Sequence, residues 1–326
     1  MSPETAQRFR RLGTLTIFAV YFVILVGGIV RASGSGMGCP DWPTCFGQLV
    51  PPTSEAELPE NYHEIYSVGY ANTDFNVVKT WTEYLNRLTG VTIGFLILLT
   101  LWASRVYLKT DKAVFYLSLS VFLLVGFQGW LGAVVVKTHL HPLMITAHML
   151  LALFIVALLI YAIARSQNDS LRLIDISQLP KRFQTVLIIA MGMTLLQVAM
   201  GTQVREAVDL IAVHHNYIDR EYWRDSFPII FYIHRSFSSI ILFTNLWLAW
   251  KIYQSVAKGN LLLRLAYALV GLIITAILAG VSLDRLGMPP VVQPIHLLMA
   301  NLIFGLQFFI YICISYAAKK AQSITP

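Results

Sequence analysis

Three polar side chains open one of the apolar segments of this chain and share one helical face. Asn86 and Arg87 lie three and four residues after Glu83, so a helix places them beside it. The segment 88–104 that follows contains no charged residue. Removing a carboxylate from water at the mouth of an apolar helix costs free energy, so acids kept in such places are usually functional. Glu83 is therefore a candidate for proton transfer.

Three histidines extend this chemistry, each near the start of a later apolar segment. His148, His234 and His296 lie in segments that cross in the same direction as the Glu83 segment, so they share its depth. Neutral imidazoles on facing helices of a four-helix bundle can ligate haem iron from both sides. His234 and His296 are predicted to hold one six-coordinate b-type haem, while His148 lies opposite Glu83 and Asn86. The alternative for a single membrane histidine is a hydrogen bond between helices.

Arginines recur at the ends of apolar segments on the side of these histidines: Arg31, Arg87, Arg205 and Arg235. A guanidinium pairs with a carboxylate through two parallel hydrogen bonds, which suits the two propionates of a haem. The alternative is that these long side chains only reach for water at the membrane interface. Their recurrence in both halves of the chain favours contacts with propionates.

The composition indicates a membrane protein. The chain has 326 residues, of which 56% are hydrophobic and 13% are charged, whereas soluble domains have about 25% charged residues. The net charge of +7 reflects basic loops on one side of a membrane, because the Lys and Arg are not grouped with aromatic residues as on a nucleic-acid-binding surface. Nucleic acid is therefore not an expected partner.

Eight apolar segments have the length of roughly 20 residues that crosses a bilayer. They lie at about 12–30, 82–104, 113–136, 143–164, 183–204, 229–250, 265–283 and 293–316. Lys and Arg cluster before the first segment, after the eighth and in alternate loops, which places both termini in the cytoplasm. The sequence predicts an all-α integral membrane protein with eight transmembrane helices and a site near its extracytoplasmic face.

The two halves of the chain repeat one pattern. The matched pairs include Gly27 with Gly201, Arg31 with Arg205, Asn86 with His234, Arg87 with Arg235 and His148 with His296. Each half contains four segments and starts from the cytoplasm, which makes the repeat parallel. We expect two pseudo-symmetric four-helix bundles, at 1–165 and 183–326, joined by a cytoplasmic linker at 166–182.

The halves differ most in the first outer loop, 32–80, which holds two cysteines and an acidic run. Cys39 and Cys45 lie close together with two prolines between them. A metal site would require a second cysteine pair, which the chain lacks. On the oxidising side of the membrane, a local disulfide is favoured over a metal site.

Taken in order, these motifs resemble those of the haem A synthase family. The resemblance lies in 27–31, 35–45, 83–87, 201–206 and the two later histidine motifs, and it covers nearly the whole chain. It implies an oxidoreductase of cytochrome oxidase assembly that oxidises the C8 methyl group of haem O to a formyl group, giving haem A. It also implies a haem b in the second half and the substrate haem O in the first.

Several family positions carry over residue by residue. They are the catalytic carboxylate at Glu83, the substrate-side ligand at His148, the haem b ligands at His234 and His296, and the loop disulfide between Cys39 and Cys45. The resemblance departs at Asn86, where many members have a histidine. It implies haem O synthase, oxidase assembly factors and a membrane electron donor as partners, in a bacterial-type cell membrane, and it leaves a homo-oligomer open.

Asn86 is expected to make the first half asymmetric. A weak amide ligand would leave one side of the substrate haem open for oxygen, and its position beside Glu83 makes it a candidate catalytic residue. The alternative is that Asn86 only caps or bonds a neighbouring helix while His63 or His141 supplies a second ligand.

Two other functions can be weighed against this one. An electron-transfer cytochrome with two b-type haems would have two paired-histidine sites, whereas this chain offers three bundle histidines and an acid. A transporter built from repeats would have broken helices near mid-membrane, whereas the polar groups here gather at the outer rim. The prenyltransferase that makes haem O is a third alternative, but its aspartate-rich diphosphate motif is absent.

Overall fold

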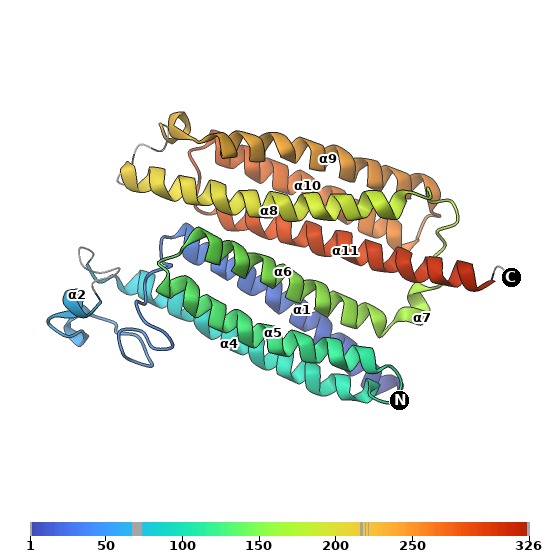
Figure 1. The fold of residues 1–326 in the computed structure, drawn as a ribbon, viewed down its shortest axis with the longest axis horizontal. Helices are drawn as coiled ribbons and strands as arrows, with labels where there is room; N and C mark the ends of the chain where they lie inside the picture. The colour runs from blue at the N-terminus through green and yellow to red at the C-terminus, as the bar shows by residue number, and fades with distance from the viewer. Residues whose placement is uncertain (1, 67–73, 216–217, 219, 221, 325–326) are drawn as a thin grey trace.

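The chain folds into long helices that run along one common direction (Figure 1). The computed structural model describes residues 2–66, 74–215, 218, 220 and 222–324. Within these residues no β-strand forms, and an isolated bridge pairs Cys45 with Gln48. Residues 67–73 of the predicted outer loop lie outside the described part.

Eight helices are long and apolar enough to cross a membrane, which confirms the predicted number in the described residues. They are α1 (Pro3–Ala32), α4 (Val77–Ser104), α5 (Lys112–Lys137), α6 (Pro142–Arg165), α8 (Phe183–His214), α9 (Ile229–Ser255), α10 (Leu261–Arg285) and α11 (Val292–Ile324). Short helical turns connect them: η1 (Glu55–Glu57), α2 (Tyr62–Ile65), η2 (Arg105–Tyr107), α7 (Asn168–Leu171) and η3 (Trp223–Ser226).

Side-chain caps begin many of the long helices. Ser2 accepts from the Thr5 amide before α1, and Asn76 accepts from the Lys79 amide before α4. Asp111 and Asn260 cap α5 and α10 in the same way. Such caps satisfy amides that have no partner inside the helix, so polar residues just before an apolar run fix where it begins.

Helix α8 is longer than its apolar run. It ends at His214, whereas the sequence predicted an end near 204. The extra turns are held by a cluster in which Val208 and Ala212 pack with Trp223 and Phe227 over the outer end of the second half. Hydropathy gives no signal for this extension, because charged residues interrupt the apolar pattern after 204.

The helices contact one another in two sets of four. In one set α1 contacts α4, α4 contacts α5, α5 contacts α6 and α6 contacts α1. In the other, α8, α9, α10 and α11 contact one another in the same cyclic order. The sets meet through α1 with α11, α6 with α11 and α6 with α8. Helix α1 begins and α11 ends at the same end of the molecule (Figure 1).

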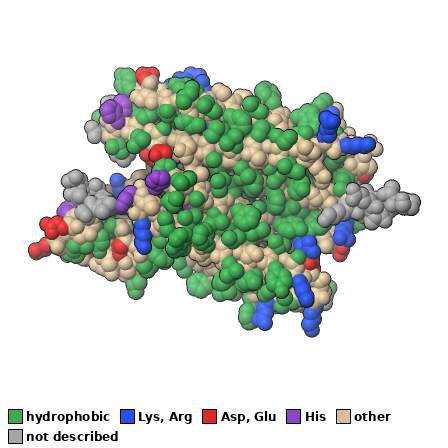
Figure 2. Space-filling view, in the orientation of Figure 1, with side chains coloured by type: hydrophobic (Ala, Val, Ile, Leu, Met, Phe, Trp, Pro, Cys, Tyr) green, Lys and Arg blue, Asp and Glu red, His purple; other side chains and the backbone are tan. Residues whose placement is uncertain are grey.

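The outer surface of the helices is largely apolar, as a lipid-facing surface must be. Large hydrophobic side chains such as Phe18, Phe95 and Phe243 are more than 60% exposed. Figure 2 shows Lys and Arg gathered toward the end where α1 begins, and His toward the opposite end. This distribution fits a multi-pass membrane protein.

A buried polar layer crosses the second set of helices. Gln307 on α11 donates to Asn245 on α9 at 2.8 Å and accepts from Thr194 on α8 at 3.1 Å. All three side chains are buried. Their counterparts in the sequence repeat are also buried but apolar: Val20, Ile97 and Leu159. The two sets therefore share a backbone pattern and differ in the chemistry of their interiors.

Candidate functional site

In the second set, each predicted haem ligand faces a glycine on the preceding helix. A Cβ atom added at Gly201 on α8 would lie 3.4 Å from Cε1 of His234 on α9. A Cβ added at Gly280 on α10 would lie 3.3 Å from Cε1 of His296 on α11. An added Cβ at either position would be in tight contact with the imidazole, so the glycines form part of the boundary of the space that holds the imidazoles.

The two imidazoles face each other across the bundle. The ring centres of His234 and His296 are 6.3 Å apart. Two imidazoles bound to one metal through bonds of about 2.0 Å place their ring centres roughly 6 Å apart. Nδ1 of His296 donates to the carbonyl of Ala276 at 2.9 Å, which leaves Nε2 as the nitrogen with a free lone pair. Nδ1 of His234 is buried with no hydrogen-bond partner in the described structure. This pair fits an axially ligated haem.

The first set repeats this arrangement with one substitution. A Cβ added at Gly132 on α5 would lie 3.5 Å from Cε1 of His148 on α6. A Cβ added at Gly27 on α1 would lie 3.9 Å from Oδ1 of Asn86 on α4, so an amide stands where the second set has an imidazole. Nδ1 of His148 and Oδ1 of Asn86 are both buried without a hydrogen-bond partner among the described residues. Unsatisfied buried polar atoms are rare in native folds, which fits a site built for a bound group.

Two glutamines support the histidines in a matched way. Gln128 on α5 and Gln197 on α8 each donate through Nε2 to the main-chain carbonyl of a histidine, His148 and His234 respectively, at 2.9 Å. Each glutamine precedes by one helical turn the glycine that faces the same histidine. Sequence reasoning missed both glutamines and the role of the glycines.

Glu83 is held by a neighbour on its own helix and by the outer loop. Its Oε1 lies 2.5 Å from Nη2 of Arg87, and its Oε2 accepts from the amide of Cys39 at 3.0 Å. The Glu83 side chain is only 5% exposed. The carboxylate is thus fixed in a water-poor position at the start of α4.

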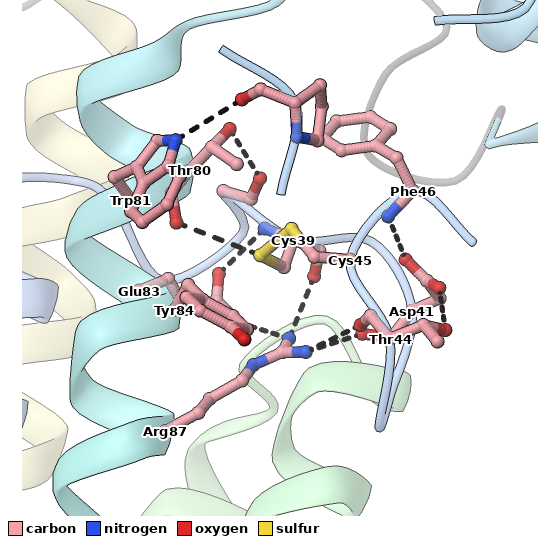
Figure 3. The surroundings of a disulfide bond; sticks show 12 residues. Cys39, Asp41, Thr44, Cys45, Phe46, Thr80, Trp81, Glu83, Tyr84 and Arg87 are labelled. Atoms are coloured by element: carbon pink, nitrogen blue, oxygen red, sulfur yellow. Dashed lines mark hydrogen bonds and ion pairs between the residues drawn. A yellow bond between two sulfur atoms is a disulfide. The ribbon is translucent and has the colours of Figure 1, made fainter. Parts of the chain in front are cut away.

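Arg87 binds the same loop through its remaining donors. Nη1 donates to the carbonyls of Asp41 and Thr44 at 2.7 and 2.9 Å, and Nη2 to that of Cys39 at 3.1 Å (Figure 3). In this structure the guanidinium predicted to meet a propionate is therefore surrounded by loop carbonyls and one carboxylate.

The loop that covers Glu83 is closed by a disulfide between Cys39 and Cys45, as the sequence favoured. Gly38 packs against α4 so closely that an added Cβ would lie 2.4 Å from the carbonyl of Lys79, so no other residue fits there. The hydroxyl of Thr80 donates to the Gly38 carbonyl at 2.9 Å. The backbone of the loop is thereby joined to the first turn of the Glu83 helix.

The acidic run folds the outer part of this loop. Glu57 accepts from the Thr53 hydroxyl at 2.6 Å and from Ser54 at 3.1 Å, and these hydrogen bonds, chiefly that from Thr53, lower the pKa of Glu57. The hydroxyl of Tyr62 donates to Glu55 at 2.9 Å. The acids thus organise the local turns.

The other three predicted arginines pair with aspartates. Nη2 of Arg31 lies 3.2 Å from Oδ2 of Asp209, and Nη2 of Arg205 lies 2.6 Å from Oδ1 of the same residue. Nη1 of Arg235 lies 3.3 Å from Oδ2 of Asp284, and its guanidinium lies 5.2 Å from the ring centre of Tyr232. Sequence reasoning missed both aspartates, since neither has a counterpart in the repeat.

The loop histidines have local roles in the structure. His141 is exposed and caps α6, where its Nδ1 accepts from the Leu143 amide at 3.3 Å. His63 packs on Tyr62 with ring centres 4.0 Å apart. His214 and His215 contact each other edge to face at the end of α8.

Residues 10–308 match the sequence model of the COX15-CtaA family, described as cytochrome oxidase assembly protein. The chain is 33% identical over 153 residues to a haem A synthase of Shewanella oneidensis, covering 47% of this chain and 44% of that protein. It is 30% identical over 173 residues to a haem A synthase of Granulibacter bethesdensis, covering 48% and 46%. These alignments span less than half of either relative. With a haem A synthase of Brucella suis the identity is 23% over 352 residues, covering 96% of this chain and 93% of that protein.

Proposed function

The chain belongs to the COX15-CtaA family of cytochrome oxidase assembly proteins, and we propose that it is a haem A synthase, an oxidoreductase that converts the C8 methyl group of haem O to the formyl group of haem A. The observation that carries this proposal is the set of four matched contacts, in which glycines face His148, His234, His296 and Asn86. Three of these positions offer an imidazole and one an amide, which supports a haem ligated on both sides in one half and a haem with one open side in the other.

The fold supports two pseudo-symmetric four-helix bundles, with boundaries at 1–165 and 183–326 and a linker at 166–182. The contact surfaces of the two halves are themselves related by the repeat. Gly28 on α1 packs against Pro294 on α11, where an added Cβ would lie 3.0 Å from Cβ of Pro294. Thr202 on α8 and Thr146 on α6, the residues that match this pair, lie 2.6 Å apart through their hydroxyl oxygens.

His234 and His296 would hold haem b in the second bundle, and His148 would ligate haem O in the first. When bound, haem b supplies a one-electron redox centre and haem O supplies the methyl carbon that is oxidised. Arg31, Arg205 and Arg235 lie at the outer ends of their helices, where they would meet propionates. Arg31 and Arg235 would do so after exchanging their present partners, and Arg205 while keeping Asp209.

Glu83 is the acid–base residue of the proposed site. With oxygen as the oxidant and the membrane electron donor supplying electrons, oxidation of the methyl group requires protons to be moved, and the Glu83 carboxylate beside Asn86 is the group placed to accept and return them. Arg87 orients this carboxylate through the 2.5 Å contact, and the disulfide-closed loop excludes water from it. Asn86 carries an unpaired buried oxygen that can orient a polar group of the substrate site.

The proposed setting is a bacterial-type cell membrane, with both termini in the cytoplasm and the site near the extracytoplasmic face. Haem O synthase, factors of terminal oxidase assembly and a membrane electron donor are the expected partners, and self-association is compatible with the apolar outer surface.

The test is the haem content of membranes from a host that makes haem O and lacks its own haem A synthase. Expression of this chain should give haem A, and Glu83→Gln should leave haem O unconverted while haem b is retained. Extracts that contain haem b and unchanged haem O in both cases would favour the electron-transfer cytochrome instead.

A further inference from the structure

One carboxylate joins the two halves of the molecule at their outer end. Asp209 lies between Arg31 of α1 and Arg205 of α8, at 3.2 and 2.6 Å. Arg205 also donates to the main-chain carbonyl of Arg31 at 3.1 Å and to the side chain of Gln293 on α11. The two arginines occupy matching positions of the repeat, yet they share a single acid.

The acid has no partner in the repeat. The position that matches Asp209 in the first half is Ser35, which lies beyond the end of α1 at Ala32. Helix α8 continues to His214 and therefore carries Asp209 on a helical turn next to the arginines. Helix α1 ends before the matching position. In the group formed by Arg31, Arg205 and Asp209, the two arginines are therefore related by the repeat and the aspartate is not.

Each arginine also lies one helical turn beyond a glycine of the site. Arg31 follows Gly27, which faces Asn86, and Arg205 follows Gly201, which faces His234. The arginines thus stand at the outer edges of the two proposed haem sites. Their side chains are 22% and 23% exposed and that of Asp209 is 42% exposed, so the acid can change partners without leaving a buried charge unpaired.

We propose that Asp209 is a positioning residue that couples occupancy of the substrate site to the redox state of haem b; this inference rests on the proposed function. When the substrate site in the first half holds no haem, the Asp209 carboxylate forms ion pairs with both Arg31 and Arg205. When a propionate of haem O pairs with Arg31, Asp209 turns fully to Arg205, beside the haem b site. The added negative charge there stabilises ferric over ferrous haem b, so the midpoint potential falls. By reciprocity, haem O binds more tightly when haem b is oxidised.

The experiment is a redox titration of haem b, followed by its visible spectrum, in purified protein with and without added haem O. Wild type should show a lower midpoint potential after haem O is added. Asp209→Asn should bind both haems but lose this shift, and Asp209→Glu should restore it. Glu206→Gln is the matched control, because it also removes one negative charge from α8, one turn before Asp209. This variant should keep the shift in midpoint potential, since Glu206 forms no ion pair in the described structure.

A shift of equal size in wild type and Asp209→Asn, or no shift in wild type with both haems bound, would overturn the coupling. Loss of the shift in Asp209→Glu and Glu206→Gln as well would show a general effect of charge or folding and would also refute it. Failure of the proposed function is separate, because it appears as wild-type protein that binds no haem b or never converts haem O.

Discussion

Arg87 lies one helical turn beyond Glu83 and holds its carboxylate at 2.5 Å, while its other donors bind three carbonyls of the loop 39–45. The orientation of Glu83 therefore depends on a loop far from it in the sequence as well as on its own helix. An arginine can do this because its planar guanidinium presents five donors in fixed directions.

Replacing Arg87 by lysine should reduce haem A formation strongly while haem b is retained. A lysine ammonium keeps the charge but cannot reach all four acceptors, so Glu83 and the loop lose their fixed relationship. Haem extraction measures the product, and limited proteolysis measures loosening of the loop. Arg105→Lys, at the other end of α4, is the matched control and should behave as wild type. Normal haem A formation by the Arg87 variant would contradict this role.

Gly280→Leu should abolish the low-spin haem b signal. An added Cβ would already lie 3.3 Å from Cε1 of His296, so a larger side chain must displace the imidazole. A Cβ added at Gly271 on the same helix would meet nothing within 4 Å, so Gly271→Leu should leave the signal unchanged. Optical spectra of the two purified variants check both expectations. Equal low-spin signals in both would show that Gly280 does not limit the space that holds His296.

Asn86→Ala should slow haem A formation without preventing haem O from binding. The variant keeps His148, the proposed ligand of haem O, but loses the buried amide beside Glu83. Haem O bound per protein and haem A formed per hour separate the two effects. Thr89→Ala, one turn further along α4, serves as the control. Loss of haem O binding in the Asn86 variant would mean that the amide is required for ligation.

Gln307→Leu should lower the free energy of unfolding by about 1–2 kcal/mol, because it removes the donor to the buried Oδ1 of Asn245, while the Thr194 hydroxyl keeps its hydrogen bond to the Ala190 carbonyl. Replacing all three residues by the apolar counterparts, as Thr194→Val, Asn245→Ile and Gln307→Leu, should recover most of this loss. Unfolding in detergent monitored by circular dichroism measures the difference. A triple variant less stable than the single one would show that the polar layer has a role beyond hydrogen bonding.

Replacing Cys39 and Cys45 by serine should destabilise the outer loop by about 2 kcal/mol or less, since the disulfide closes a short loop. The larger effect should be on haem A formation, because the Cys39 amide and carbonyl contact Glu83 and Arg87. Thiol labelling of wild type without reductant should leave both cysteines unmodified. Full labelling would show that the disulfide does not form in the membrane.

The number and order of the long helices could be predicted from hydropathy, because a bilayer demands apolar segments of fixed length. Their ends could not. The last turns of α8 are held by Val208 and Ala212 packing against Trp223, a contact within the stretch 205–228 that hydropathy treats as a single loop.

The positions of His148, His234, His296 and Asn86 could be aligned from the repeat, but the residues around them could be predicted only in part. The number of residues between Gly132 and His148 equals that between Gly280 and His296. This equal spacing is present in the sequence and indicates that the two glycines share a role. The contacts of Arg87 leave no such signal, since its acceptors are main-chain carbonyls that every residue has. Asp209 was missed because a comparison of repeats finds only what both copies keep.

The contacts of Gly28 with Pro294 and of Thr202 with Thr146 exchange places when the two halves are aligned. A surface that pairs with a rotated copy of itself is the hallmark of a symmetric dimer. The eight helices can thus be regarded as two subunits fused into one chain, with the polypeptide enforcing equal stoichiometry. Because the two halves belong to one chain, they can differ at single positions: the first has Asn86 where the second has His234, and the second has Asp209 where the first has Ser35. We expect the segment 183–324, made by itself, to self-associate through the face of α8 and α11 that now contacts α1 and α6.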